Sequence, residues 1–251
     1  MLSRPAVLTV SGLCLLPGDA PINVDIGGGH IVGLAGLDGH GQDLFLQALA
    51  GLHASHTGSI QVHFETGSQT IGSYTDAERA GLAYLPSDRK KNGIFPMLSV
   101  ADNFLLGAAR EFAPNGWIRS ARVRDKLEKF RQELAISFAS SKTPIRNLSG
   151  GNQQKVLLAR VMASNPHVLL LNDPTRGVDI QTRHALYRYF RRAISDLGTT
   201  IVVFSTELEE LTELCDEVLV FRDNGVFARL NRAELSLDGL MQAMFGEGAG
   251  S

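Results

Sequence analysis

The sequence predicts an α/β fold with a mixed central sheet, and three stretches carry this prediction. Residues 30–35 are an apolar run followed by a glycine-rich loop and then by helical spacing, which is the order strand, loop, helix. Residues 167–171 and 200–204 are continuous apolar runs, as expected for strands buried on both faces of a parallel sheet. With 251 residues, the chain is long enough to bury a large core.

Composition and charge narrow the class of protein. The hydrophobic fraction is 44% and the charged fraction 20%, which are ordinary values for a soluble domain. The net charge of −2 gives no sign of a nucleic-acid partner. Cys14 and Cys215 lack metal-ligand spacing, so we expect reduced thiols and a cytosolic compartment. No run is long enough to span a bilayer, and residues 1–10 lack the apolar core of a signal peptide.

The remaining helices and strands are expected before, between and after these core strands in the sequence. Antiparallel strands near a sheet edge are predicted at 6–10, 22–26, 59–64 and 69–72, and a further core strand at 82–85. Helices are predicted at 75–80, 99–106, 120–134, 153–162 and 182–196, with a break at 112–117. Strands at 217–221 and 226–230 flank Asp223-Asn224-Gly225, which is a strong hairpin signal.

The loop after the first core strand is a candidate phosphate-binding loop. In the pattern G-x-x-x-x-G-K-[ST], a Lys and then a Ser or Thr follow the last glycine, but Gln42 and Asp43 stand there. The change removes a charged donor and brings a carboxylate close to the phosphate position. Weak nucleotide binding and a loop kept only for packing are both open from this loop alone. The candidate nucleotide-binding residues are Gly36, Gly39, Gly41, Gln42 and Asp43.

Residues 147–156, with the sequence NLSGGNQQKV, form a polar, glycine-rich turn that runs into a helix. Ser149 is expected to cap this helix, and Gly150 and Gly151 let backbone N–H groups approach a ligand closely. The free N–H groups and the positive dipole end of a helix start form an anion site. Ser-Gly-Gly alone is equally typical of an ordinary helix start, whereas the ten residues together are far more specific.

These ten residues resemble the signature motif of ABC transporter ATPases, in the form common in sugar importers. In that family the motif closes over the γ-phosphate of an ATP molecule held by a partner subunit. The resemblance implies the P-loop NTPase fold of ABC ATPases, in which the central sheet has an antiparallel edge and a helical subdomain is inserted. It implies a single domain over residues 1–247, with a core at about 1–96 and 163–247, a helical subdomain at about 97–162 and a tail at 248–251. The signature residues implied to meet the partner's ATP are Leu148, Ser149, Gly150, Gly151 and Gln153.

The resemblance continues at residues 168–179, which are similar to the Walker B and D-loop sequence. Asn172 replaces the Asp that helps to hold Mg²⁺ in the family, and Asp173 replaces the catalytic Glu. The D-loop residue Asp179, which faces the partner subunit in the family, is kept. Since Asp43 is a carboxylate that the family pattern lacks, Asp43 and Asn172 are the candidate Mg²⁺ positions.

Three further family positions are altered. Thr206 aligns with the switch histidine and Ser87 with the glutamine of the Q-loop. Residues 13–20 contain no Phe, Tyr or Trp, although the family usually has an aromatic residue there that stacks on adenine. The basic run of residues 89–91 is read either as a solvated turn or as a contact with a membrane permease.

The resemblance thus implies an asymmetric ATP-binding subunit of a carbohydrate-type importer, with a degenerate site of its own and an intact signature. ATP and Mg²⁺ would bind mainly at a site shared with a second ATPase domain or subunit, in a heterodimer. Permease subunits and, indirectly, a solute-binding protein are the other implied partners, at the inner face of the cell membrane. Since the chain begins with Met1, we expect the second ATPase on another polypeptide, the alternative being a fused domain that this sequence does not include. The alternatives are a self-sufficient ATPase subunit and a soluble ABC protein outside transport.

Two mutational expectations follow from this interpretation. The isolated chain should hydrolyse ATP weakly or not at all, because Gln42, Asp173 and Thr206 replace the groups that carry hydrolysis in the family. Ser149→Arg or Gly151→Asp should lower hydrolysis by the assembled complex and leave the folding of this chain nearly unaffected.

Overall fold

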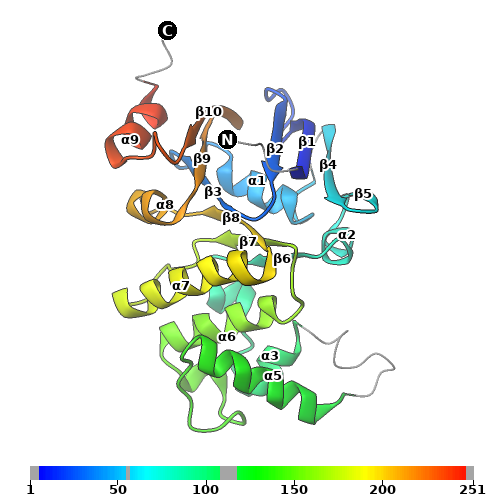
Figure 1. Ribbon diagram of the computed structural model, residues 1–251, viewed down its shortest axis with the longest axis vertical. Helices are drawn as coiled ribbons and strands as arrows, with labels where there is room; N and C mark the ends of the chain where they lie inside the picture. The colour runs from blue at the N-terminus through cyan, green and yellow to red at the C-terminus, as the bar shows by residue number, and fades with distance from the viewer. Residues whose placement is uncertain (1–5, 55–56, 108–117, 247–251) are drawn as a thin grey trace.

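The computed structural model describes residues 6–54, 57–107 and 118–246, which form a sheet-containing lobe and a helical lobe (Figure 1). The predicted break at residues 112–117 and the predicted tail at 248–251 lie outside the described residues. No helix in the described ranges is long and apolar enough to cross a membrane.

The central sheet has six strands in the order β10-β9-β3-β8-β7-β6. The five strands β9, β3, β8, β7 and β6 run parallel, and β10 pairs antiparallel with β9 at the edge. Their bounds are β3 (Ile31–Gly36), β6 (Leu82–Leu85), β7 (Val168–Asn172), β8 (Thr200–Phe204), β9 (Glu217–Arg222) and β10 (Gly225–Asn231). Every residue of β7 is buried, which confirms the prediction of a strand covered on both faces.

The remaining strands form a separate antiparallel sheet with the order β2-β1-β4-β5. They are β1 (Ala6–Cys14), β2 (Ile22–Gly27), β4 (Thr57–Phe64) and β5 (Gly67–Thr70). The prediction of antiparallel strands in these regions is confirmed, and they pack on the central sheet rather than extend its edge. Buried and exposed residues alternate along β2, as expected for a sheet with one face toward the core and the other toward solvent.

The helices divide between the two lobes (Figure 1). Around the central sheet lie α1 (Gln42–Leu49), α2 (Tyr74–Arg79), α7 (Ile180–Leu197), α8 (Leu208–Leu214) and α9 (Leu237–Phe245). Between β6 and β7 in the chain lie η1 (Arg89–Gly93), α3 (Val100–Leu105), α5 (Ser120–Glu133), η2 (Ile145–Asn147) and α6 (Gly150–Met162). The helices predicted near residues 75–80, 99–106, 120–134, 153–162 and 182–196 are therefore all present.

Two hydrophobic clusters hold the central sheet between them. Leu169 and Leu171 of β7 join the cluster that contains the helical lobe. Val168 and Leu170 join the cluster that contains α1 and the antiparallel sheet. This division follows from the alternation of side chains along a strand. Because the five core strands are parallel, the loops after β3, β6, β7 and β8 all leave the same edge of the sheet, where ligands of open α/β sheets bind.

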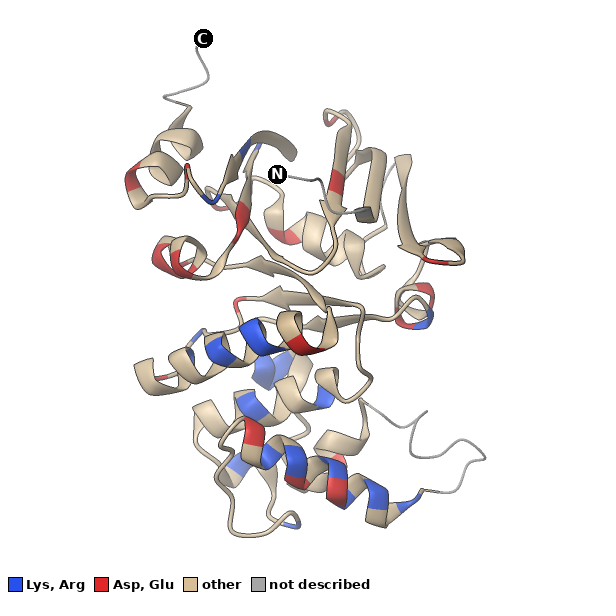
Figure 2. Cartoon of the chain, in the orientation of Figure 1, with Lys and Arg blue, Asp and Glu red and all other residues tan. Residues whose placement is uncertain are grey.

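Charge is distributed unequally between the lobes (Figure 2). Across residues 87–192, Lys and Arg outnumber Asp and Glu by 19 to 8. In the rest of the chain, Asp and Glu outnumber Lys and Arg by 18 to 5. The chain is therefore nearly neutral as a whole but basic across residues 87–192 and acidic elsewhere.

Candidate functional site

The glycine loop between β3 and α1 is bridged by the side chain of Gln42. The Gln42 amide donates hydrogen bonds to the carbonyl oxygens of Gly36 (3.1 Å) and Leu37 (2.9 Å), and Gln42 is only 3% exposed. Gly39 and Gly41 have φ values of +79° and +98°, a region that glycine adopts without strain. A neutral side-chain amide is thus bound to the backbone of the loop.

The hairpin turn between β9 and β10 contacts the same glycine loop. Asp223 and Asn224 both have positive φ, which confirms the predicted hairpin between β9 and β10. The Asn224 N–H donates to the His40 carbonyl oxygen (3.1 Å), and the Asp223 N–H donates to His40 Nδ1 (3.2 Å). A Cβ atom at Gly41 would lie 2.7 Å from the Asn224 Cα atom, so this position requires glycine.

The two candidate metal positions are brought together but bind each other. The Asn172 amide donates to Asp43 Oδ1 at 2.6 Å and to the Tyr84 hydroxyl oxygen at 3.1 Å. The Gln47 amide donates to the second oxygen of Asp43 at 2.9 Å. Since Asn172 turns N–H groups toward the carboxylate, this pair does not fit Mg²⁺, which binds oxygen ligands. The described residues contain no group of three or more His, Cys, Asp and Glu side chains able to hold a metal ion.

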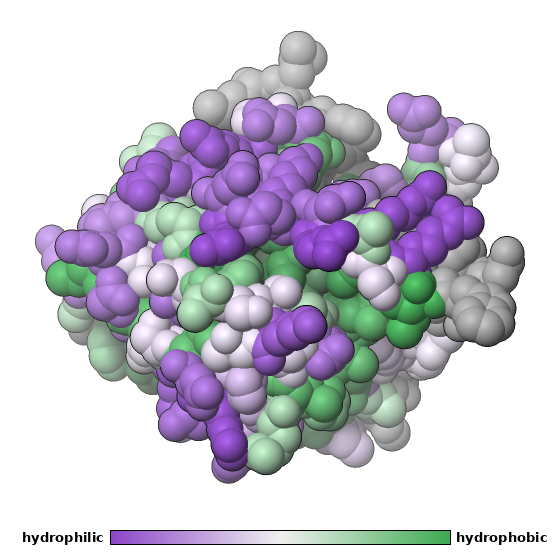
Figure 3. All heavy atoms as spheres, turned by 90° about the horizontal axis from the view of Figure 1, so that it is seen from below, coloured by the Kyte–Doolittle hydropathy of each residue, from purple (hydrophilic) through white to green (hydrophobic). Residues whose placement is uncertain are grey.

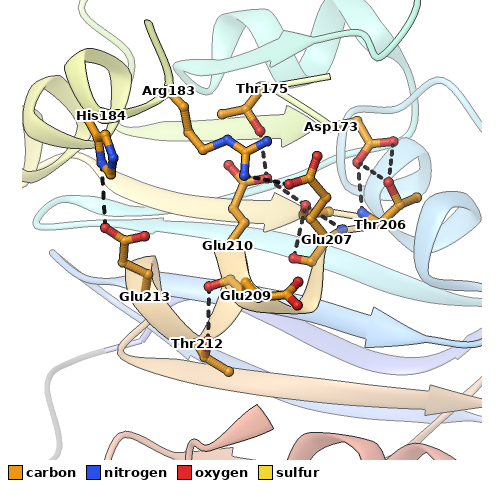
Figure 4. A network of polar contacts seen from close by, with 11 residues as sticks. Asp173, Thr175, Arg183, His184, Thr206, Glu207, Glu209, Glu210, Thr212 and Glu213 are labelled. Atoms are coloured by element: carbon orange, nitrogen blue, oxygen red, sulfur yellow. Dashed lines mark hydrogen bonds and ion pairs between the residues drawn. The ribbon is translucent and has the colours of Figure 1, made fainter. Parts of the chain in front are cut away.

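The catalytic-glutamate and switch positions also pair with each other. Asp173 Oδ1 accepts hydrogen bonds from the Thr206 N–H (2.8 Å) and the Thr206 hydroxyl (3.2 Å), as Figure 4 shows. Asp173 has a φ of +45°, and its own N–H donates to the Phe204 carbonyl oxygen at 2.8 Å. Burial raises the pKa of the Asp173 carboxyl, against the lowering effect of the Thr206 hydrogen bonds. The carboxylate is therefore held by protein donors in the place where a general base would need access to water.

A cavity of about 300 Å³ collects the residues predicted for this chain's own site. Its lining includes Gly39, Gly41, Gln42, Asp43, Ser87, Asn172, Asp173 and Thr206. These residues, which are far apart in the sequence, therefore lie together in the folded chain. Arg176 also lines the cavity, and no feature of its sequence surroundings singled it out.

The signature turn differs from the glycine loop in that the start of its helix is exposed to solvent. Ser149 is the N-cap of α6, and its hydroxyl oxygen accepts hydrogen bonds from the Asn152 N–H (3.4 Å) and the Asn152 side-chain amide (3.0 Å). The predicted cap is therefore confirmed. Ser149 is exposed, whereas Leu148 is buried. The Gln153 amide points inward and donates to the carbonyl oxygens of Ile145 (3.3 Å) and Leu148 (3.0 Å), so it supports the turn from behind.

Gly151 is buried against the D-loop, and this corrects one expectation. A Cβ atom at Gly151 would lie 2.9 Å from Thr182 Oγ1 and 3.4 Å from Asp179 Oδ2. The expectation that Gly151→Asp leaves folding nearly unaffected is wrong, because the added carboxylate would meet these two side chains inside the same chain. The smallness of Gly151 is needed for packing.

Asp179 caps the helix that follows the D-loop. Its carboxylate accepts hydrogen bonds from the N–H (2.9 Å) and hydroxyl (2.8 Å) of Thr182, and these bonds lower its pKa. The cap fixes the point where the D-loop ends and α7 begins.

Several residues that sequence reasoning missed tie the D-loop segment to its neighbours. The buried Gln154 amide donates to the Pro174 carbonyl oxygen at 2.7 Å. The carboxylate of Glu210, which is 1% exposed, accepts hydrogen bonds from Thr175 (3.0 Å) and Ser205 (2.5 Å), and burial raises its pKa (Figure 4). Arg183 of α7 forms an ion pair of 2.6 Å with Glu207. Periodicity gives no signal for these contacts, because each depends on which backbone or side-chain atom lies opposite after folding.

A glycine loop at the carboxyl edge of a parallel sheet, with a capped glycine turn on a helical lobe, defines an ATP-binding cassette. The profile of the ABC transporter family matches residues 20–176, and the chain belongs to that family. The cassette fold is confirmed by solved structures. The chain is similar to cbiO1 from Clostridium perfringens, with a TM-score of 0.75 and 21% identity over 92% of this chain and 90% of that chain. It is also similar to MJ1267, an ATP-binding cassette of an ABC transporter, with a TM-score of 0.78 and 16% identity over 98% and 100%.

Curated relatives are more similar in sequence. YphE of Escherichia coli (strain K12), an uncharacterized ABC transporter ATP-binding protein, is 36% identical over 239 residues, which are 95% of this chain and 47% of that protein. The ribose import ATP-binding protein RbsA 1 of Rhizobium johnstonii is 37% identical, over 86% of this chain and 42% of that protein. The xylose import ATP-binding protein XylG of Burkholderia ambifaria is 39% identical, over 85% and 40%. The chain thus spans about half the length of the curated relatives it matches.

Proposed function

We propose that this chain is the ATP-binding subunit of a carbohydrate importer in which its own nucleotide site does not support hydrolysis. Its signature turn completes the ATP site of a partner ATPase domain, as in a heterodimer. The observation that carries the proposal is the contrast between the two sites: the Gln42 amide binds two carbonyl oxygens of the glycine loop, whereas the helix start at Ser149 is exposed.

The contacts within this chain's own site support the first half of the proposal. A phosphate group in the glycine loop would have to displace Gln42, which satisfies two backbone carbonyls there. Asp43 would then repel the phosphate, since two unit charges about 4 Å apart repel by about 4 kcal/mol at an effective dielectric constant of 20. Asp173 is held by Thr206 and is not free to activate water. Binding of the nucleotide phosphates, binding of Mg²⁺ and activation of water by Asp173 are therefore all weakened in this chain's own site.

The start of α6 supports the second half. The first N–H groups of a helix lack partners within the helix and carry partial positive charge. Ser149 adds a hydroxyl at the exposed end of this helix. Such a turn stabilises a polyphosphate presented by a second chain, and it does so without ionisable groups of its own.

A second cleft supports contact with a membrane permease. A cavity of about 640 Å³ lies between the lobes and is lined by Tyr74 and Tyr84 from the sheet lobe and by Arg160 from α6. The helical lobe also exposes large apolar side chains, and Figure 3 shows hydrophobic surface beside hydrophilic side chains at that end of the molecule. Among the described residues, the large apolar side chains exposed on this lobe are Phe95, Met97, Leu98, Leu106 and Ile118. Exposed apolar residues on one lobe are typical of a protein contact surface.

The class of cargo rests on the relatives. The names of the relatives RbsA 1 and XylG state ribose and xylose import, so a carbohydrate is the proposed solute class for this chain. Permease subunits, and a solute-binding protein acting through them, complete the proposed assembly at the inner face of the cell membrane.

The test is ATP hydrolysis by the complex of this chain with its partner ATPase and permease. Ser149→Asp keeps a good N-cap but places a negative charge where a phosphate would bind. We expect a loss of at least about tenfold in hydrolysis, or about 1.4 kcal/mol in the transition state. Ser164→Asp, the same substitution at an exposed serine just after the other end of α6, is the matched control and should hydrolyse ATP as the wild type does.

Two results would decide against the proposal. Unchanged hydrolysis with Ser149→Asp would mean that the signature turn serves no ATP site. Robust hydrolysis by the purified chain alone, lost in Asp173→Asn, would favour a self-sufficient ATPase subunit.

A further inference from the structure

The basic run after β6 does not act as one surface. Lys90 and Lys91 are exposed, as in a solvated turn, but Arg89 is partly buried and turns toward the signature and D-loop turns. Arg89 is the first residue of η1, and its side chain reaches across to two other segments of the chain. Neither of the two interpretations of this run from the sequence describes that position.

The guanidinium group of Arg89 lies between the two turns that would face a partner. Its Nη1 atom donates a hydrogen bond to the Arg176 carbonyl oxygen at 3.0 Å, at the start of the D-loop. Its Nη2 atom lies where a Cβ atom at Gly150 would approach within 2.7 Å, at the signature turn. A Cβ atom at Gly177 would also lie within 3.8 Å of both terminal nitrogens. One planar group therefore contacts both turns.

A second bridge runs parallel to the first. The Gln154 amide of α6 donates to the Pro174 carbonyl oxygen at 2.7 Å, two residues before the carbonyl that Arg89 holds. Further along, Gly151 packs against Thr182 and Asp179. The D-loop segment thus meets the start of α6 at three points, and Arg89 is the one of these contacts that comes from a third segment, η1.

We propose that Arg89 is a positioning residue that holds the signature turn and the D-loop turn as one unit, so that both meet the partner's ATP site in a fixed relation. The role rests on the proposed function, because it matters only if these turns complete another domain's site. A guanidinium suits it because it is planar and offers donors in two directions, whereas the ammonium of lysine is a point charge. Arg89 does not touch the reacting atoms and acts through Ser149, Gly150 and the D-loop.

The test compares Arg89→Ala, Arg89→Lys and Arg122→Ala in the complex with the partner ATPase and permease. Arg122 is an exposed arginine of the same lobe and serves as the matched control. We expect Arg89→Ala to lower kcat about tenfold, the effect of losing one hydrogen bond from a charged donor, with KM for ATP within about twofold of wild type. Arg89→Lys should recover only part of the loss. Guanidinium ion, well below denaturing concentrations, should restore part of the activity of Arg89→Ala and leave Arg89→Lys unchanged.

Each remaining outcome bears on the proposal. Wild-type kcat in Arg89→Ala, a fall of equal size in Arg122→Ala, or full recovery in Arg89→Lys would overturn the positioning role. A fall in kcat matched by an equal loss of folded complex in both Arg89 variants would overturn it as well. Ser149→Asp, measured in the same experiment, distinguishes failure of the proposed function from failure of the Arg89 role. If Ser149→Asp has no effect on hydrolysis, the proposed function fails. If Ser149→Asp lowers hydrolysis and Arg89→Ala does not, only the role of Arg89 fails.

Discussion

The pair formed by Asp43 and Asn172 gives the sharpest test of this chain's own site. Asn172→Asp restores the carboxylate that the family carries and places it against Asp43, with which Asn172 now shares a hydrogen bond of 2.6 Å. The variant loses a hydrogen bond to a charged acceptor, worth about 1.5–3 kcal/mol. It gains repulsion between two carboxylates, about 4 kcal/mol at about 4 Å and an effective dielectric constant of 20.

Proton uptake relieves part of this repulsion and fixes the pH dependence. When two carboxyls share a site, one pKa rises above its value in the unfolded chain. The folded variant then binds a proton that the unfolded chain releases, so its stability falls as pH rises and recovers as pH falls. If about 3 kcal/mol remains uncompensated at pH 8, Tm falls by about 10 °C for a domain of this size.

The assay is thermal unfolding of the variant and the wild type at about pH 5 and pH 8, in EDTA and in Mg²⁺. We expect Asn172→Asp to lose Tm at pH 8 in EDTA and to regain it at pH 5 or with Mg²⁺, since two carboxylates now offer oxygen ligands. The wild type should not respond to Mg²⁺. Asn165→Asp, on an exposed turn, is the control for the substitution itself. A variant that unfolds with the wild-type Tm at pH 8 in EDTA would refute the reasoning.

Two further predictions concern the D-loop segment. Burial raises the pKa of Glu210, so the wild type loses stability as pH rises above the unfolded pKa of about 4.5. The Tm of Glu210→Gln should therefore increase relative to the Tm of the wild type as pH rises from about 5 to about 8. A difference in Tm between the two proteins that does not change with pH would contradict this prediction. Gly151→Asp should lower Tm by at least about 5 °C, because overpacking costs about 1–3 kcal/mol and the new carboxylate lies near Asp179. An unchanged Tm would contradict the claim that the packing of α6 against Asp179 and Thr182 requires glycine at this position.

Patterns that depend on neighbouring residues predicted much of the fold. The apolar run that became β7, the turn at Asp223 and Asn224 and the cap at Ser149 are confirmed, since each follows from local periodicity or backbone preference. Gln42, Asp173 and Thr206 meet in one cavity, because loops at the carboxyl ends of parallel strands share an edge.

Contacts chosen by the folded backbone could not be predicted in the same way. The sequence shows that glutamine replaces the lysine of the phosphate-binding pattern at position 42. It does not indicate that the Gln42 amide donates to the carbonyl oxygens of Gly36 and Leu37. The same holds for Arg89 and Gln154, whose acceptors are backbone carbonyls more than fifteen residues away. Gly151 was read as a contact for a ligand, and the packing of α6 against Asp179 gives it a second role inside the chain.

The most direct test of the central claim is to find where nucleotide binds in the assembled complex. A photoreactive ATP analogue, cross-linked to the complex and located by mass spectrometry, reports which chain's glycine loop holds the phosphates. The account predicts label on the glycine loop of the partner ATPase, loss of that label when Ser149→Asp is introduced into this chain, and none on residues 36–43. Label on residues 36–43 of this chain that is insensitive to Ser149→Asp would contradict it.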